Sequence, residues 1–276
     1  MRHLVETRNG YAVAAVLLIV YFALFSASLP GRETLPAAVS ALLDFKVLWL
    51  CVLISLWRIA AAPHRALRRG DIAVGGLIVA LAALSAGLWS WLLLVAFTLL
   101  FLRGTDQQEV RQALYLVLAI GCHEAGVRLL GEVFGDTLLA LDASIAEVLS
   151  HWFFAGVHAY GTSLQAIGGH SVVLVWGCSS FSYVGDMMLL CWAVTLLLGS
   201  EQGAGRGLWK WLALVAGLTV TLNAMRLALM AAEPQTYSFL HDGAGAVIFR
   251  IVILAGAVGV AWLQSVHVEH KSLRIA

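Results

Sequence analysis

Long apolar stretches separated by short polar connections dominate the pattern of this chain. Most of them approach twenty residues with few charges, the length that an α-helix needs to cross the hydrocarbon core of a bilayer. The pattern predicts about eight membrane-spanning helices, over residues 11–29, 37–60, 71–86, 88–102, 111–131, 178–198, 208–231 and 244–265. We therefore expect an all-α polytopic membrane protein.

One connection, residues 132–177, is long enough to hold structure of its own. Over Thr137–Phe154 apolar side chains recur at helical spacing, which predicts an amphipathic helix lying on or dipping into the membrane face. Two further segments, Ala159–Ile167 and Ser171–Trp176, flank the dipeptide Gly168-Gly169, which suits the positive φ angles of a two-residue turn. The connection therefore predicts a small amphipathic helix followed by a β-hairpin.

The distribution of Lys and Arg predicts the orientation of the chain in the membrane. Basic residues gather on one side, at Arg2, Arg8, Arg58, Arg65, Arg68, Arg69, Arg103, Arg111, Arg206, Lys210, Lys271 and Arg274. The opposite connections, which include residues 132–177 and 232–242, are poor in them. Cytoplasmic loops carry the excess of basic residues. We expect a multi-pass protein of the cell (inner) membrane, with both termini in the cytoplasm and residues 132–177 outside it.

Composition agrees with this class and excludes several others. Hydrophobic residues make up 61% of the chain and charged residues 12%, with a mean hydropathy of +0.89, values that a soluble core does not explain. The net charge of +1 suggests no nucleic-acid partner. The simplest organisation is a single membrane domain over 1–276, with five helices in 1–131, the external helix and hairpin in 132–177, and a three-helix catalytic part in 178–276.

The metal-ligating residue types show no spacing of a metal site. Cys51, Cys122, Cys178 and Cys191 form no C-x-x-C pair, which argues against a zinc knuckle or a disulfide framework. His151, His158 and His170 lack the spacing of a second ligand and are interpreted as surface residues. We expect no metal and no cofactor.

Three residues that can carry chemistry fall near the same predicted membrane boundary. Cys178 opens one span, Arg226 lies near the end of the next, and His241 shortly precedes the last. Arg and His are costly near hydrocarbon. A helix N-terminus favours a negatively charged sulfur, an imidazole can take a thiol proton and return it to a leaving amine, and a guanidinium can hold an oxyanion or a carboxylate. This triplet predicts a thiol active site.

Neighbouring polar residues fit a supporting role. Asn223 lies three residues before Arg226 and therefore shares its face of the helix. Ser179 suits the cap of the helix that begins near Cys178. Asp242 either orients His241 or caps the last helix, and the cap is the favoured interpretation.

These motifs resemble the exosortase/archaeosortase family of membrane cysteine transpeptidases. The resemblance rests on Gly177-Cys178-Ser179-Ser180-Phe181 after a hairpin, on Asn223-Ala-Met-Arg226, and on His241-Asp242-Gly243, and it covers the second half of the chain. It implies that Cys178 is the nucleophile and that Arg226 and His241 complete the site. It also implies exported protein substrates, cleaved within membrane lipid at a C-terminal signal of a motif, a transmembrane helix and a basic tail. Ser180 departs from the pattern, which usually has Gly there.

Each residue also has an ordinary structural explanation. A lone Cys is commonly buried in a core, an Arg near a helix end can extend to the interface, and a His in a loop needs no partner. The same cluster fits a transporter in which Arg226 and His241 gate a polar substrate, or a non-catalytic assembly factor. A transporter predicts paired broken helices and inverted repeats, which the sequence does not show. The sequence favours a cysteine transpeptidase or protease.

Overall fold

The computed structural model describes residues 13–19, 46–62, 76–77, 80–81, 87–103, 105–153, 156–198, 207–241 and 243–273. Helices dominate these residues, and three short strands form a small sheet. The chain divides into two compact units, Met1–Arg128 and Leu129–Ala276, with the boundary inside one long helix. The single membrane domain expected over residues 1–276 stays a prediction.

The first unit contains the apolar helices α4 (Lys46–Ala61) and α6 (Leu88–Leu102) and the beginning of α7 (Gln108–Phe153). Helices α6 and α7 approach each other closely at Gly121, where an added Cβ would lie 2.9 Å from Cγ2 of Val95. Helices α4 and α6 lie in the segments predicted as spans over 37–60 and 88–102, but their 16 and 15 residues fall below the roughly 20 that a full span needs. Most residues of the spans predicted over 11–29 and 71–86 lie outside the described residues.

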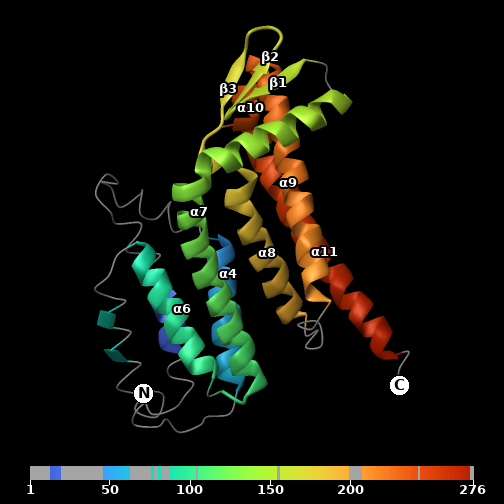
Figure 1. Cartoon of the computed structure of the whole chain (residues 1–276). Coiled ribbons are helices and arrows are strands. Elements are labelled where there is room, and N and C mark those ends of the chain that lie inside the picture. The colour runs from blue at the N-terminus through green and yellow to red at the C-terminus, as the bar shows by residue number, and fades with distance from the viewer. Residues whose placement is uncertain are drawn as a thin grey trace. The chain divides into compact units, whose positions relative to one another are not determined.

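The second unit is built on three apolar helices, α8 (Ser180–Leu197), α9 (Leu208–Ala232) and α11 (Ala244–Leu273), which pack against one another (Figure 1). Among the described residues, four stretches are helical and apolar over a length that can cross a membrane: Gln108–Trp152, Ser180–Leu197, Leu208–Ala232 and Ala244–Val268. Two shorter apolar helices cover Val47–Ala61 and Leu88–Leu102. These helices agree with a membrane protein, whereas the count of about eight spans stays a prediction.

Helix α7 differs from the prediction of two separate helices over 111–131 and 137–154. It runs without interruption for 46 residues, from Gln108 to Phe153. Gly131 ends the first predicted helix and Gly135 lies between the two, and a single Gly costs only about 1 kcal/mol within a helix. At helical rise α7 is about 69 Å long, far more than the roughly 30 Å of a hydrocarbon core. Its amphipathic last part therefore continues the apolar first part directly.

The sheet contains one strand more than the predicted hairpin. Strands β1 (Val157–Tyr160), β2 (Ser163–Ala166) and β3 (Ser171–Val173) are antiparallel and lie in the order β1-β2-β3. The predicted reversal at Gly168-Gly169 is confirmed, with Gly169 at a φ of 85°, although the loop has four residues rather than two. The segment predicted as one strand over 159–167 is broken at Gly161, whose φ of 58° starts a second reversal.

The connection predicted as a loop between the last two spans contains helix α10 (Pro234–His241). Pro234 occupies its first position, where the missing N–H costs nothing and the fixed φ suits a helix. Leu240, which is buried, anchors α10 in the core. Two glycines follow α10. A Cβ added at Gly243 would lie 2.7 Å from the carbonyl oxygen of Phe239, and a Cβ added at Gly245 would lie 2.6 Å from Cε1 of Phe239. The turn into α11 therefore needs small residues here.

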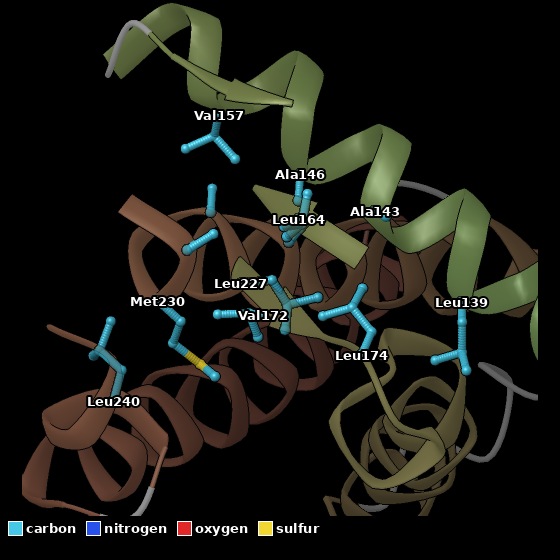
Figure 2. Close-up of a cluster of buried hydrophobic side chains, with 13 residues drawn as sticks. Leu139, Ala143, Ala146, Val157, Leu164, Val172, Leu174, Leu227, Met230 and Leu240 are labelled. Atoms are coloured by element: carbon cyan, nitrogen blue, oxygen red, sulfur yellow. The ribbon is translucent and has the colours of Figure 1, made fainter. Parts of the chain in front are cut away.

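One cluster of buried side chains joins α7, the sheet, α9 and α10 (Figure 2). Its members are Leu139, Ala143, Ala146, Val157, Leu164, Val172, Leu174, Ala224, Leu227, Ala228, Met230, Ala231 and Leu240. The strands contribute one residue each from their buried face, whereas the neighbouring residue Val173 is exposed, as the alternation of a strand requires. This core holds the sheet and α10 at the end of α9, where the polar residues gather.

Replacement of Leu164 by Ala tests this core. Leu164 is 0% exposed, so the truncation leaves a cavity and should lower the free energy of unfolding by about 2–5 kcal/mol. Val173→Ala, an exposed position on β3, should cost no more than about 1 kcal/mol. Denaturant unfolding of the purified chain in detergent measures both. Equal losses of stability in the two variants would contradict the assignment of Leu164 to the buried face of the sheet and of Val173 to its exposed face.

Candidate active site

Cys178 lies just before helix α8 rather than within it. The chain leaves β3 and makes a single 3-10 turn, Trp176–Cys178, in which the Cys178 N–H donates to the Val175 carbonyl at 2.8 Å. Ser179 follows as the N-cap, and α8 begins at Ser180. Cys178 is half-buried. The sequence predicts the thiol at a helix N-terminus. In the structure Cys178 lies one residue before the N-cap of α8.

A buried carboxylate occupies the N-terminus of α8 instead. Oδ2 of Asp142 accepts hydrogen bonds from the Ser179 hydroxyl at 2.6 Å and from the Ser180 N–H at 2.8 Å. Ser179 in turn accepts from the Phe181 N–H at 3.2 Å, which confirms its predicted role as a cap. Asp142, Ser179 and Ser180 are all 0% exposed. The Asp142 carboxyl group, rather than the thiol, is therefore the group that accepts hydrogen bonds at the positive end of the α8 dipole.

Sequence reasoning missed Asp142, although a signal was present. Asp142 lies four residues after Leu138 and three before Ile145, so it falls on the apolar face of the amphipathic segment. A carboxylate on an apolar face needs a hydrogen-bonding partner. The partner was not predictable, because Ser179 is 37 residues away in the chain.

Asn223 holds the backbone around Cys178 from the side of α9. Its Nδ2 donates to the carbonyl oxygen of Cys178 at 2.8 Å and to the hydroxyl of Ser180 at 3.1 Å. Asn223 is buried, so these bonds form away from solvent. The hydroxyl of Ser180 thus takes part in the network.

Arg226 is buried within the protein, with 8% of its surface exposed. Its Nε donates to the carbonyl oxygen of Leu240 at 3.0 Å, and its Nη1 lies 3.5 Å from Oδ1 of Asn223. Leu240 is in the last turn of α10, where carbonyl groups lack a partner within the helix and a cation is favourable. These contacts contradict the interpretation of Arg226 as a side chain that extends to the interface. Arg226 instead fixes the end of α10, next to His241.

His241, the last residue of α10, faces the thiol. Its Nε2 lies 3.8 Å from Sγ of Cys178. Its ring stacks on Tyr237, one turn earlier, with centroids 5.0 Å apart and an interplanar angle of 13°. His170 meets the same tyrosine edge to face and contacts the Met230 carbonyl through Nε2 at 3.3 Å. Tyr237 therefore orients the imidazole, and His170 is half-buried behind it rather than on the open surface.

The second unit thus brings together most of the residues singled out in the sequence. Cys178 and His241 meet directly, Asn223 binds the Cys178 backbone, and Arg226 acts on His241 through Leu240. Asp242 lies outside the described residues. A thiol and an imidazole at this separation can exchange a proton with a small side-chain movement.

Comparison of the chain with protein-family models, curated proteins and solved structures finds no match.

Replacement of Asp142 by Ala tests the anchor of this site. The Ser179 hydroxyl and the Ser180 N–H would remain buried without an acceptor, at about 1–3 kcal/mol for each, so the free energy of unfolding should fall by about 2–4 kcal/mol. Asp136→Ala, an exposed position on the same helix, should change it by less than about 0.5 kcal/mol. Thermal and denaturant unfolding in detergent measure the difference. An Asp142→Ala protein as stable as the Asp136→Ala control would show that α8 does not depend on this carboxylate.

Proposed function

We propose that this chain is a membrane cysteine transpeptidase or protease with exosortase-like chemistry. The observation that supports this most directly is the 3.8 Å separation between Sγ of Cys178 and Nε2 of His241. A structural cysteine is commonly buried, as Cys51 and Cys191 are. Cys178 is half-exposed and faces an imidazole whose ring is held by stacking. This arrangement has the elements of an activated nucleophile.

In the proposed reaction His241 moves one proton in each half. The thiol proton of Cys178 passes to Nε2 of His241 as the sulfur attacks the scissile carbonyl carbon. The imidazolium then returns the proton to the leaving amine, the C–N bond breaks, and a thioester on Cys178 remains. In the second half His241 takes a proton from an incoming amine, hydroxyl or water. That nucleophile attacks the thioester carbonyl, and the departing sulfur regains the proton.

Arg226 serves this reaction in two ways in our proposal. Through Nε and the Leu240 carbonyl it fixes the end of α10 and thereby the position of His241. Its other guanidinium nitrogens make only the long contact with Asn223 among the described residues. They remain available for the oxyanion of the tetrahedral intermediate or for a substrate carboxylate, which a planar guanidinium binds well.

We propose as substrates exported proteins with a C-terminal motif, a transmembrane helix and a basic tail. Cys178 precedes α8, Arg226 lies near the end of α9 and His241 precedes α11, so all three lie at the same end of these apolar helices. A peptide bond next to the end of a substrate's own transmembrane helix reaches the same depth. The Lys and Arg distribution places this end outside the cytoplasm, in the proposed inner-membrane orientation.

Cleavage of a reporter that carries such a signal, taken from a candidate substrate of the same genome, tests the function. Cys178→Ala should abolish cleavage and leave uncleaved precursor, because the replacement removes the sulfur that attacks the scissile carbonyl in the proposed reaction. Cys122→Ala is the matched control, since Cys122 is also exposed, and it should keep near-normal cleavage. Immunoblotting of precursor and product at equal protein level gives the readout. Normal cleavage by Cys178→Ala would reject the proposed nucleophile and favour a transporter or an assembly factor.

Replacement of Arg226 by Lys tests whether the positive charge alone is sufficient for turnover or the planar guanidinium is needed. Lys keeps the positive charge but loses the planar fork that binds the Leu240 carbonyl and an oxyanion together, so turnover should fall by about tenfold to a thousandfold. Arg250→Lys, an exposed position on α11, should leave turnover unchanged. Initial rates of reporter cleavage at matched protein level measure both. Full activity in Arg226→Lys would reduce the proposed site to Cys178 and His241.

A further inference from the structure

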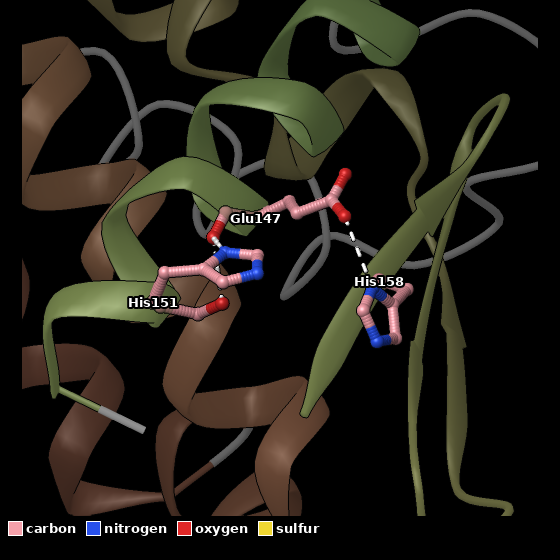
Figure 3. A network of polar contacts seen from close by, with 4 residues as sticks. Glu147, His151 and His158 are labelled. Carbon is pink, nitrogen blue, oxygen red and sulfur yellow. Dashed lines mark hydrogen bonds and ion pairs between the residues drawn. The ribbon is translucent and has the colours of Figure 1, made fainter. Parts of the chain in front are cut away.

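A second group of ligating side chains lies where α7 leads into the sheet (Figure 3). Glu147 and His151 are four residues apart on the last part of α7, and His158 is on β1. One ligating atom from each of the three lies within 4.8 Å of the other two. The group shares no residue with the Cys178 and His241 pair.

The hydrogen bonds of this group leave imidazole nitrogens available for a ligand. Nδ1 of His151 lies 2.7 Å from the carbonyl oxygen of Glu147. Because a carbonyl oxygen only accepts, Nδ1 carries the proton and Nε2 carries the lone pair. A histidine that binds a metal usually donates its other ring N–H to a backbone carbonyl or a carboxylate in this way, which fixes its tautomer. His151 therefore has the protonation pattern of a metal ligand.

His158 differs from His151, because its Nδ1 shares a proton with the Glu147 carboxylate, and a metal bound by both groups would take the place of that proton. Nδ1 of His158 lies 3.1 Å from Oε1 of Glu147, so a carboxylate and a second imidazole already meet. Both histidines are exposed and Glu147 is partly exposed, so the group is accessible from solution. Exposure also leaves these side chains free to change rotamer.

Two imidazoles and one carboxylate form a donor set that selects among metals. It is the set of three-ligand zinc sites, which keep a fourth position for water. Imidazole also suits Co²⁺, Ni²⁺ and Cu²⁺, whereas Mg²⁺ and Ca²⁺ prefer oxygen ligands. With metal–ligand distances of about 2.0–2.1 Å, tetrahedral ligand atoms lie about 3.4 Å apart. Small rotations of exposed side chains close the present separation to that value.

We propose that Glu147, His151 and His158 bind a divalent transition metal such as Zn²⁺. The metal would join the last turns of α7 to β1, the first strand of the sheet that leads to Cys178. A ligand that binds only the folded chain stabilises it in proportion to the logarithm of its concentration. The site therefore acts as a metal clip between the helix and the sheet.

Isothermal titration of the purified full chain in detergent with ZnCl₂, and with CoCl₂ followed by visible absorption, tests the proposal. The parent protein carries Cys122→Ala and Cys178→Ala, because exposed or half-exposed thiols also bind zinc. We expect this parent to bind one Zn²⁺ and to unfold at a higher temperature with the metal. His151→Ala and His158→Gln in the parent should each weaken binding at least tenfold and remove the thermal shift.

His267→Ala provides the control, since His267 is an exposed histidine on α11. It should leave affinity and thermal shift unchanged. The melting temperatures of all variants without metal show whether each remains folded, and His158 is exposed on β1, so its replacement should not unfold the chain. Binding that His151→Ala and His158→Gln do not weaken, or that the parent lacks, would overturn the proposal.

Discussion

The organisation of the candidate active site depends on one buried carboxylate. Removing a carboxylate from water is costly unless hydrogen bonds and a favourable field replace its hydration. Asp142 obtains two such hydrogen bonds through Oδ2, from Ser179 and from the first residue of α8, where the helix dipole is positive. The interaction determines where α8 begins. It also ties α7 to the segment that carries Cys178, so the thiol cannot shift without disturbing two buried hydrogen bonds.

A chain of hydrogen bonds extends from this anchor to the carbonyl of Leu240, the residue before His241. Ser180 receives a bond from Asn223, which also holds the Cys178 carbonyl, and the next polar residue on α9, Arg226, contacts Asn223 and binds the Leu240 carbonyl. These bonds are buried or partly buried and join α7, α8, α9 and α10 within the second unit. The thiol and the imidazole are therefore positioned by the same network from opposite sides. Such support by surrounding groups is what holds reacting atoms within the tolerance that catalysis requires.

The sequence predicts elements that local pattern determines and misses those that depend on distant contacts. The apolar helices near 88–102, 180–197 and 208–232 follow from length and hydrophobicity, and the reversal at Gly168-Gly169 follows from the conformational freedom of glycine. The proximity of Cys178 and His241 was predictable because both fall at the same boundary. The pairing of Asp142 with Ser179 and the capping of α10 by Arg226 were not, since no local pattern specifies a partner so far along the chain.

The position of Asp142 also decides which group must activate the thiol. Two of the first N–H groups of α8 are taken by Asp142 and by the Ser179 hydroxyl, so these donors do not face Cys178. Asp142 thus occupies the helix N-terminus, and the thiol lies outside the cap. Removal of the thiol proton in the proposed reaction then falls to His241. This explains why the imidazole is so strongly constrained, by Tyr237 against one face and by Arg226 at the preceding carbonyl.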